Sequence, residues 1–345
     1  MRKTEIDVAK GFALFFVVLG HVLVWDHKLT LWIFMFHMPA FFFLSGMTFR
    51  PEKYPSFIIL LKDKLKKRIR PYFLITFIGF AICMLRPLYR QPILDAGWHY
   101  LLMSIFFYGH PQNLYIGQIW FLTALFSSEL LAWVWFRFLG KRSIALRCFS
   151  LTLLAWIAIN VRRLDLPVVH HLPWKLDSAL CAVIFLIAGY YAAKTKVFDR
   201  LWTAGMGWFL IPFTLWLSYY FGPKWYGYVN LCDCVYSPGP YYFLVAFLAI
   251  AALFFTAMLC KHSRFWQYCG RYSLPMFSAQ TFAIYGINEI IVRATGIAYE
   301  PRHSMPGRLG VLISIAAFAL MAAFVFPWHI YKKKKAEKTQ MEANE

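Results

Sequence analysis

Three ionisable residues, Lys10, His21 and His37, lie inside long apolar stretches, where burying a charge in a membrane is costly. Lys10 and His21 are eleven residues apart, so a helix would place them on nearly the same face, ~16 Å apart along its axis. An imidazole takes up and releases protons near neutral pH, which suits general acid or base catalysis. These spacings predict two histidines at similar depth facing one cavity, with Lys10 nearer the opposite end.

Each of these three residues also has a purely structural alternative. A membrane histidine can serve as a hydrogen-bonded packing group between helices, and this alternative stays open for His21 and His37. A lysine near the end of a helix can extend its ammonium to the lipid headgroups, which is the alternative for Lys10.

A strongly basic segment, KDKLKKRIRPY, follows the second apolar stretch and contains Arg68 and Arg70. The planar guanidinium group presents a fork of donors that suits phosphate oxygens, so this segment is a candidate phosphate clamp. Its alternative is a topology signal attracted to anionic lipids. Pro71 ends the segment and is expected in the first turn of the third helix.

Further polar or aromatic residues at membrane depth are Trp120, Asp177 and Ser45, which we take as candidate substrate-binding residues. Trp120 is equally typical of an interfacial anchor, and Asp177 of a helix N-terminus stabilised by the helix dipole. None of these three residues decides a function alone.

The elements that must position these groups are hydrophobic helices. Of 345 residues, 60% are hydrophobic and only 15% are charged, well below the charged share of a soluble domain. About 20 apolar residues cross a bilayer, and ten such stretches occur. They are approximately 6–25, 31–49, 71–88, 116–136, 144–161, 176–193, 203–221, 240–260, 272–292 and 309–331. Segment 97–109 is too short and fits an interfacial or re-entrant piece.

The distribution of basic residues sets the orientation of these ten stretches. With a cytoplasmic N-terminus, 25 of the 36 Lys and Arg residues fall in inner segments and 10 in outer ones, as the positive-inside rule requires. The sequence thus predicts an all-α, polytopic bundle of about ten transmembrane helices with both termini cytoplasmic. Residues 1–331 would form the membrane domain and 332–345 a basic cytoplasmic tail. The same loop bias explains the net charge of +20, so we expect no nucleic-acid partner.

The seven cysteines show no zinc-ligand spacing, and we therefore expect no metal. Cys232 and Cys234 share one loop, but a C-x-C pair alone is a weak signal. The apolar N-terminal stretch is interrupted by Lys10 and is followed by no small-residue cleavage site, so we interpret it as a retained first helix.

Six strings, in this order, resemble the acyltransferase-3 family of integral membrane O-acyltransferases, most of all its fucose 4-O-acetylase-like branch. They are DVAKGFALFFVVLGHV, FHMPAFFFLSG, KKRIRPY, IWFLTALF, PWKLDSALCAVIFLIAGY and GRYSLPMF. Lys10 and His21 correspond to the family's basic-residue-x10-His motif, and Arg68 and Arg70 to its arginines before the third helix. Gln280 stands near a position where many members have histidine.

The resemblance implies an enzyme of the cytoplasmic (inner) membrane that moves an acetyl group from cytoplasmic acetyl-CoA to a hydroxyl of a surface or lipid-linked carbohydrate. His21 would be the general base or an acetylated intermediate, with His37 assisting it. Lys10, Arg68 and Arg70 would hold the donor, and Trp120 would stack on the sugar. Membrane lipids surround the protein, and nothing in the sequence sets its oligomeric state.

Two other classes of protein compete with this prediction. A transporter or flippase for a lipid-linked sugar would use buried His and Lys residues as a substrate or proton path. A structural membrane scaffold would leave Lys10, His21 and His37 without a role.

The predicted topology is testable with reporter fusions. Fusions after Lys28, Gln91 and Asn230 should report outside, whereas fusions near Lys64, Lys196 and the C-terminus should report inside, because basic loops stay in the cytoplasm. A C-terminal reporter that is active outside would contradict an even number of spans with a cytoplasmic N-terminus.

Overall fold

The predicted all-α class is confirmed by the computed structural model, which describes residues 4–85, 87–111, 114, 116–161, 172–224, 228–237, 239–296 and 305–342. Within these ranges β structure is limited to one short hairpin and an isolated bridge between Leu23 and Met305. The hairpin pairs β1 (Val229–Asn230) with antiparallel β2 (Val235–Tyr236), and Asn230 lies opposite Val235.

Helices of very different length follow one another along the chain. In order, they are α1 (Thr4–Val22), α2 (Lys28–Thr48), η1 (Pro51–Lys53), α3 (Phe57–Lys64), η2 (Leu65–Ile69), α4 (Arg70–Leu85), α5 (Pro87–Ala96), α6 (Trp98–Leu102), η3 (Met103–Phe107), η4 (Gly117–Ile119), α7 (Trp120–Phe138), α8 (Ile144–Asn160), η6 (Pro173–Lys175), α9 (Leu176–Thr195), α10 (Val197–Thr203), α11 (Gly207–Lys224), α12 (Tyr241–Leu259), α13 (Arg264–Arg271), α14 (Ser273–Thr295) and α15 (Gly307–Glu342). Each of the ten predicted spans coincides with one long helix, and segment 97–109 forms only the short pair α6 and η3.

Six helical segments in the described ranges are both long and apolar enough to cross a membrane. They are Lys28–Thr48, Phe57–Leu85, Gly117–Phe138, Pro173–Thr195, Tyr241–Leu259 and Gly307–Tyr331. The protein is therefore a multi-pass membrane protein, while the count of ten spans stays a prediction. α15 continues through the basic segment that we expected to form a separate tail.

Pro71 lies in the first turn of α4, as expected, but the helix itself begins earlier in the chain. One helical rod runs from Phe57 to Leu85, because α3 continues into α4 through the π-helical turn η2. Pro71 comes two residues after this turn, where the wider i+5 hydrogen-bond pattern has just ended and the missing N–H of a proline is tolerated. Sequence alone places a helix start at the proline because π-turns carry no simple signature.

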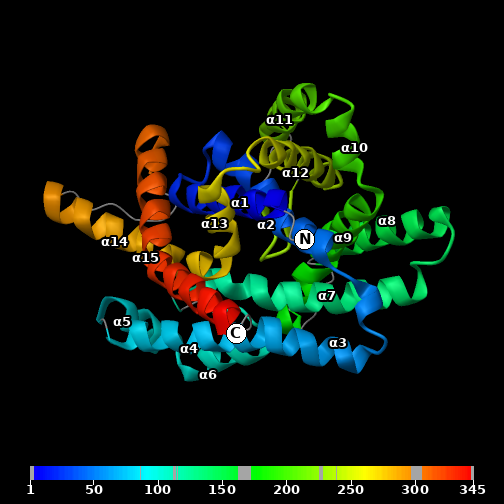
Figure 1. Ribbon diagram of the computed structural model, residues 1–345. Helices are drawn as coiled ribbons and strands as arrows, with labels where there is room; N and C mark the ends of the chain where they lie inside the picture. Colours follow the sequence, from blue (N-terminus) through cyan, green and yellow to red (C-terminus); the bar gives the residue numbers. More distant parts are fainter. Residues whose placement is uncertain are drawn as a thin grey trace.

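Helix α2 lies at the centre of the bundle, in contact with α1, α9, α11 and α12 (Figure 1). Its hydropathy is high all round, and the side chains from Trp32 to Leu44 are all buried. A helix that is apolar on every face is stable only when other helices or lipid surround it. The side chains of this helix are therefore held in place from all sides.

Two glycines let α2 and α9 cross at backbone contact. A Cβ atom on Gly46 would overlap the carbonyl oxygen of Leu186, and one on Gly189 would overlap the carbonyl oxygen of Phe43. Small residues at such reciprocal positions allow close van der Waals packing between membrane helices. The α2/α9 pair is consequently a rigid unit.

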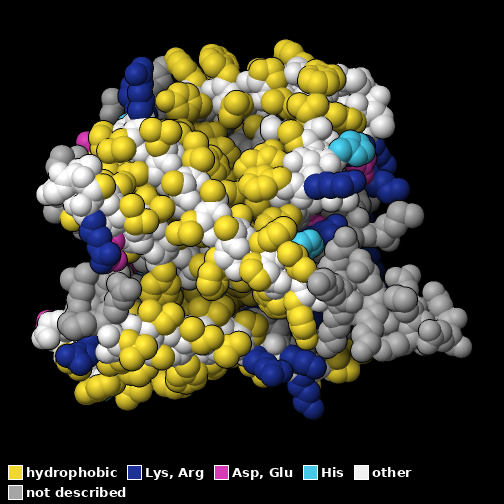
Figure 2. Space-filling model, turned by 60° about the vertical axis from the view of Figure 1, so that its left-hand side comes forward, with side chains coloured by type: hydrophobic (Ala, Val, Ile, Leu, Met, Phe, Trp, Pro, Cys, Tyr) yellow, Lys and Arg dark blue, Asp and Glu magenta, His cyan; other side chains and the backbone are white. Residues whose placement is uncertain are grey.

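The outer surface is mostly apolar, as a lipid-facing surface must be. Figure 2 shows one face covered largely by hydrophobic side chains, with Lys and Arg gathered toward its edges. Large side chains such as Leu74, Trp208 and Phe324 are more than half exposed, which in water would promote aggregation.

Replacing Gly189 by Ala should destabilise the protein by about 1–3 kcal/mol, because the added methyl group must push α9 away from α2. Gly286→Ala is the matched control, since a Cβ there has no atom within 4 Å and alanine favours a helix. Thermal unfolding of the two purified variants in detergent measures the difference. Equal melting temperatures for both would show that the close crossing is not needed.

Candidate functional site

Two adjoining cavities lie between the central helices of the described part of the chain. The larger, which we call the histidine cavity, has a volume of about 570 Å³ and is lined by His21, Trp25, Phe34, His37, Met38, His110, Gly117, Gln118, Trp120, Tyr228, Asn230, Leu231, Cys232, Asp233, Phe277 and Tyr285. The smaller, the lysine pocket, has a volume of about 90 Å³ and is lined by Lys10, Phe41, Ser45, Arg68, Phe121, Leu122, Leu125, Ser273, Leu274 and Phe277. Phe277 lines both, so the cavities meet at this side chain.

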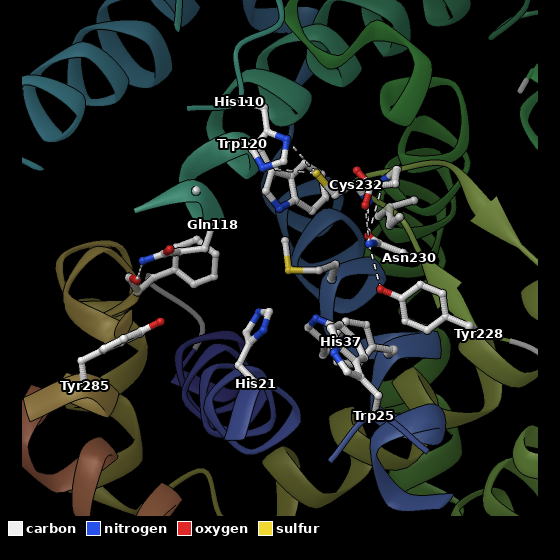
Figure 3. Close-up of a pocket in the computed structure, with 16 residues that line it drawn as sticks. His21, Trp25, His37, His110, Gln118, Trp120, Tyr228, Asn230, Cys232 and Tyr285 are labelled. Atoms are coloured by element: carbon white, nitrogen blue, oxygen red, sulfur yellow. Dashed lines mark hydrogen bonds between the residues drawn. The ribbon is translucent and has the colours of Figure 1, made fainter. Parts of the chain in front are cut away.

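The two histidines expected to share a cavity do so. The ring centroids of His21 and His37 are 6.3 Å apart, with the rings nearly perpendicular (Figure 3). His37 is buried, and its Nδ1 lies 2.8 Å from the carbonyl oxygen of Ile33. A carbonyl can only accept, so Nδ1 carries the proton and Nε2 of the neutral ring is an acceptor. Backbone contact thus fixes both the orientation and the tautomer of His37.

Trp120 also lines the histidine cavity, at the first residue of α7. Next to it, the amide of Gln118 is held by α14: Nε2 donates to the carbonyl of Phe277 at 3.3 Å, and Thr281 donates to Oε1 at 3.0 Å. These bonds connect the start of α7 to α14 across the cavity. Aromatic and amide groups thereby line the same space as the base candidates.

Lys10 lines the lysine pocket, one cavity away from His21 on the same helix. Three phenyl rings, those of Phe41, Phe121 and Phe277, pack against one another along the lysine pocket, with centroids 5.6–6.4 Å apart, and Phe277 also lines the histidine cavity. We call these rings the aromatic partition. A cationic pocket and a cavity with two histidines thus adjoin at this apolar cluster.

Arg68 lines the lysine pocket but is also bound to a buried carboxylate. Its Nε and Nη2 donate to Glu129 at 3.1 and 3.0 Å, and Lys64 donates to the same carboxylate at 2.8 Å. Glu129 is 2% exposed, so the two cations compensate a charge that would otherwise be very costly in the bundle. Arg70 is exposed and does not line the pocket.

The remaining candidates lie apart from the histidines. Ser45 lines the lysine pocket rather than the histidine cavity. Asp177 is buried behind the cavity, where its Oδ1 accepts from the backbone N–H of Ser178. Ser178 in turn donates to the carbonyl of Cys232, so this helix start supports the loop that closes the cavity.

A family model described as an acyltransferase domain matches residues 3–332, nearly the whole chain. The chain belongs to the acyltransferase-3 family. No curated protein and no solved structure matches it. Together with the apolar helices, this membership makes the protein a multi-pass membrane acyltransferase.

The acyltransferase has cavity residues that the sequence did not reveal, among them His110, Asn230 and Asp233. His110 and Cys232 are 122 residues apart in the chain, yet Sγ lies 3.4 Å from Nδ1. No motif spacing predicts such a long-range pair, and only the C-x-C loop gave a weak indication. Burial raises the pKa of the Cys232 thiol well above its usual range.

Replacing Glu129 by Gln should destabilise the acyltransferase by roughly 3 kcal/mol, because the buried ammonium of Lys64 and the Arg68 guanidinium lose their counter-charge. Glu289→Gln is the matched control, since Glu289 forms an exposed pair with Arg293 and such pairs contribute little. Thermal unfolding in detergent compares the two. A melting temperature for Glu129→Gln as high as that of the control would mean that the buried network does not stabilise the fold.

Proposed function

We propose that this acyltransferase is an O-acetyltransferase that moves an acetyl group from cytoplasmic acetyl-CoA to a hydroxyl of a surface or lipid-linked carbohydrate. The observation that carries the proposal is the pair of adjoining cavities: cations line one, two histidines line the other, and Phe277 lines both. Acetyl-CoA carries anionic phosphates at one end and a reactive thioester at the other, so it suits a cationic pocket that adjoins a cavity with histidines.

The lysine pocket suits the end of the donor. Its volume of about 90 Å³ is enough for the acetyl thioester and the adjoining part of its arm, but not for a nucleotide. The phosphates would remain at the mouth, near the exposed side chains of Lys66, Lys67 and Arg70. Lys10 and Arg68 would steady the arm, and Arg68 would do so while bound to Glu129.

The histidine cavity suits a sugar. At about 570 Å³ it lies within the ordinary range for small-molecule sites, and it combines aromatic faces with amide and carboxylate groups. Trp120 and Trp25 offer apolar faces, whereas Gln118, Asn230 and Asp233 offer hydrogen bonds to hydroxyl groups. Ser45 would contribute indirectly, because it lines the lysine pocket. Asp177 would do so through Ser178, which donates to the carbonyl of Cys232 in the hairpin loop.

His21 would act as the general base. It would accept the proton of the acceptor hydroxyl as the oxygen attacks the thioester carbonyl, after which the C–S bond breaks and the CoA thiol leaves with a proton. Alternatively, the His21 ring would accept the acetyl group first and pass it to the hydroxyl. His37, fixed by Ile33, would position or assist this ring.

The proposed setting is the cytoplasmic membrane, with both termini inside and the histidine cavity toward the outer side, where surface polysaccharides would be modified. The basic inner segments support this orientation. The resemblance of the six strings to the fucose 4-O-acetylase-like branch supports a sugar acceptor rather than a protein one.

The deciding variant is His21→Gln, which keeps hydrogen bonding and much of the volume but cannot accept a proton near neutral pH. We expect acetyl transfer to fall by about 10²- to 10⁴-fold with expression and insertion unchanged. His99→Gln, the same change at an exposed histidine, should keep full activity. The measurement is mass spectrometry of surface glycans from cells that express each variant.

Two results would contradict the proposal. A well-folded His21→Gln variant with near-normal activity would exclude His21 as the base. Glycans that change their side of the membrane without gaining acetyl mass would instead identify a transporter, the competing class.

A further inference from the structure

Three side chains with metal-binding atoms meet on the histidine cavity: His110, Cys232 and Asp233. Their ligand atoms all lie within 4.8 Å of one another. Figure 3 shows His110 pointing at Cys232, with Asn230 and its hydrogen bonds beside them. The group is distinct from the pair His21 and His37, although it faces the same space.

The spacing of these atoms fits a tetrahedral ion. With zinc–sulfur and zinc–nitrogen bonds of about 2.3 and 2.05 Å, a tetrahedral zinc separates the two atoms by about 3.6 Å. The Sγ of Cys232 lies 3.4 Å from Nδ1 of His110. A carboxylate oxygen of Asp233 lies within 4.8 Å of both atoms.

The chemistry of the donors selects the class of cation. Thiolate and imidazole favour zinc and similar transition metals, whereas magnesium and calcium prefer oxygen ligands alone. Three protein ligands also leave a fourth position open, as in catalytic rather than structural zinc sites. All three side chains line the histidine cavity, from which a fourth ligand would come.

The loop that carries two of the ligands is held in place by its own hydrogen bonds. Cys232 and Asp233 lie at the tip of the β1/β2 hairpin. The side-chain oxygen of Asn230 accepts from the backbone N–H of Cys232 at 3.0 Å, and its Nδ2 donates to Asp233 Oδ2 at 2.6 Å. Partners of this kind orient metal ligands before the metal binds.

His110 is fixed from the other side. Its backbone N–H donates to the carbonyl of Ser104 at 2.8 Å, and Thr123 donates to the carbonyl of Gly109 at 2.8 Å. Gly109 has a φ of 67°, and a Cβ there would lie only 2.8 Å from Thr123. The first turn of α7 therefore requires this glycine and sets the position of the histidine after it.

The charges around the group leave room for a divalent cation. Lys175 is fully buried, its Nζ has no hydrogen-bond partner among the described residues, and it interacts electrostatically with Cys232, Asp177 and Asp233. The two carboxylates outnumber this ammonium, and a bound cation would release the proton that the buried thiol of Cys232 otherwise keeps.

We propose that His110, Cys232 and Asp233 bind one zinc ion, or a transition-metal cation of the same class, with its open position toward the histidine cavity. This proposal replaces our sequence-based expectation of no metal, which rested on the absence of short ligand spacings. If the cavity holds an acceptor sugar, as the proposed function has it, the open position would bind and polarise one of its oxygens. The binding of the cation itself does not depend on that function.

The test uses the full-length protein in detergent, purified with a tag that contains no histidine, stripped with a chelator and titrated with Co²⁺. A thiolate-to-cobalt absorption band that saturates at one equivalent, and that Zn²⁺ abolishes, is expected. Cys232→Ser should remove the band, and His110→Ala should weaken affinity at least about 100-fold, because even outer partners of metal ligands are worth 10- to 100-fold. Cys234→Ser, on the same loop but outside the group, should bind as the unaltered protein does.

Two outcomes would overturn the proposal: no thiolate band in the unaltered protein, or a band that survives Cys232→Ser. In either case the contact between Cys232 and His110 is a hydrogen bond only. If the band behaves as expected but no glycan gains an acetyl group, the metal site stands and the proposed acetyl transfer is wrong.

Discussion

The cost of burying an ionised carboxylate governs how this bundle is assembled. Glu129 is almost fully removed from solvent, so α7 is stable in its position only while Lys64 and Arg68 reach it from the neighbouring rod. Lys64 precedes the π-turn and Arg68 lies within it. The same α7 begins with Trp120, so a charge balance near the middle of the helix also fixes one side of the histidine cavity.

A second constraint comes from backbone packing. α2 and α9 meet through Gly46 and Gly189, and α2 carries His37 while α9 begins beside the hairpin that carries Cys232. Both residues are therefore attached to a rigid pair of helices. Another side of the cavity comes from α14, which contributes Phe277 and Tyr285.

The sequence predicted the features that follow from the membrane environment, namely the ionisable residues within apolar stretches and the long helices. Lys10, His21 and His37 stood out because ionisable groups are rare in such stretches, and the structure places the two histidines together. It also predicted the helical class and the location of the long helices. It missed the π-turn, and with it the true start of the helix around Pro71, because that turn packs against Glu129, 61 residues after Arg68. The contact between His110 and Cys232 was missed since only folding unites them.

The aromatic partition has a consequence for the membrane as an electrical insulator. A passage from one side of a bilayer to the other would let protons and hydrated ions leak, and the phenyl rings of Phe41, Phe121 and Phe277 offer such ions no hydrogen bonds. An apolar constriction dewets and blocks conduction. Three such rings where the lysine pocket adjoins the histidine cavity would therefore oppose a continuous file of water between the two, which helps the membrane to keep its voltage.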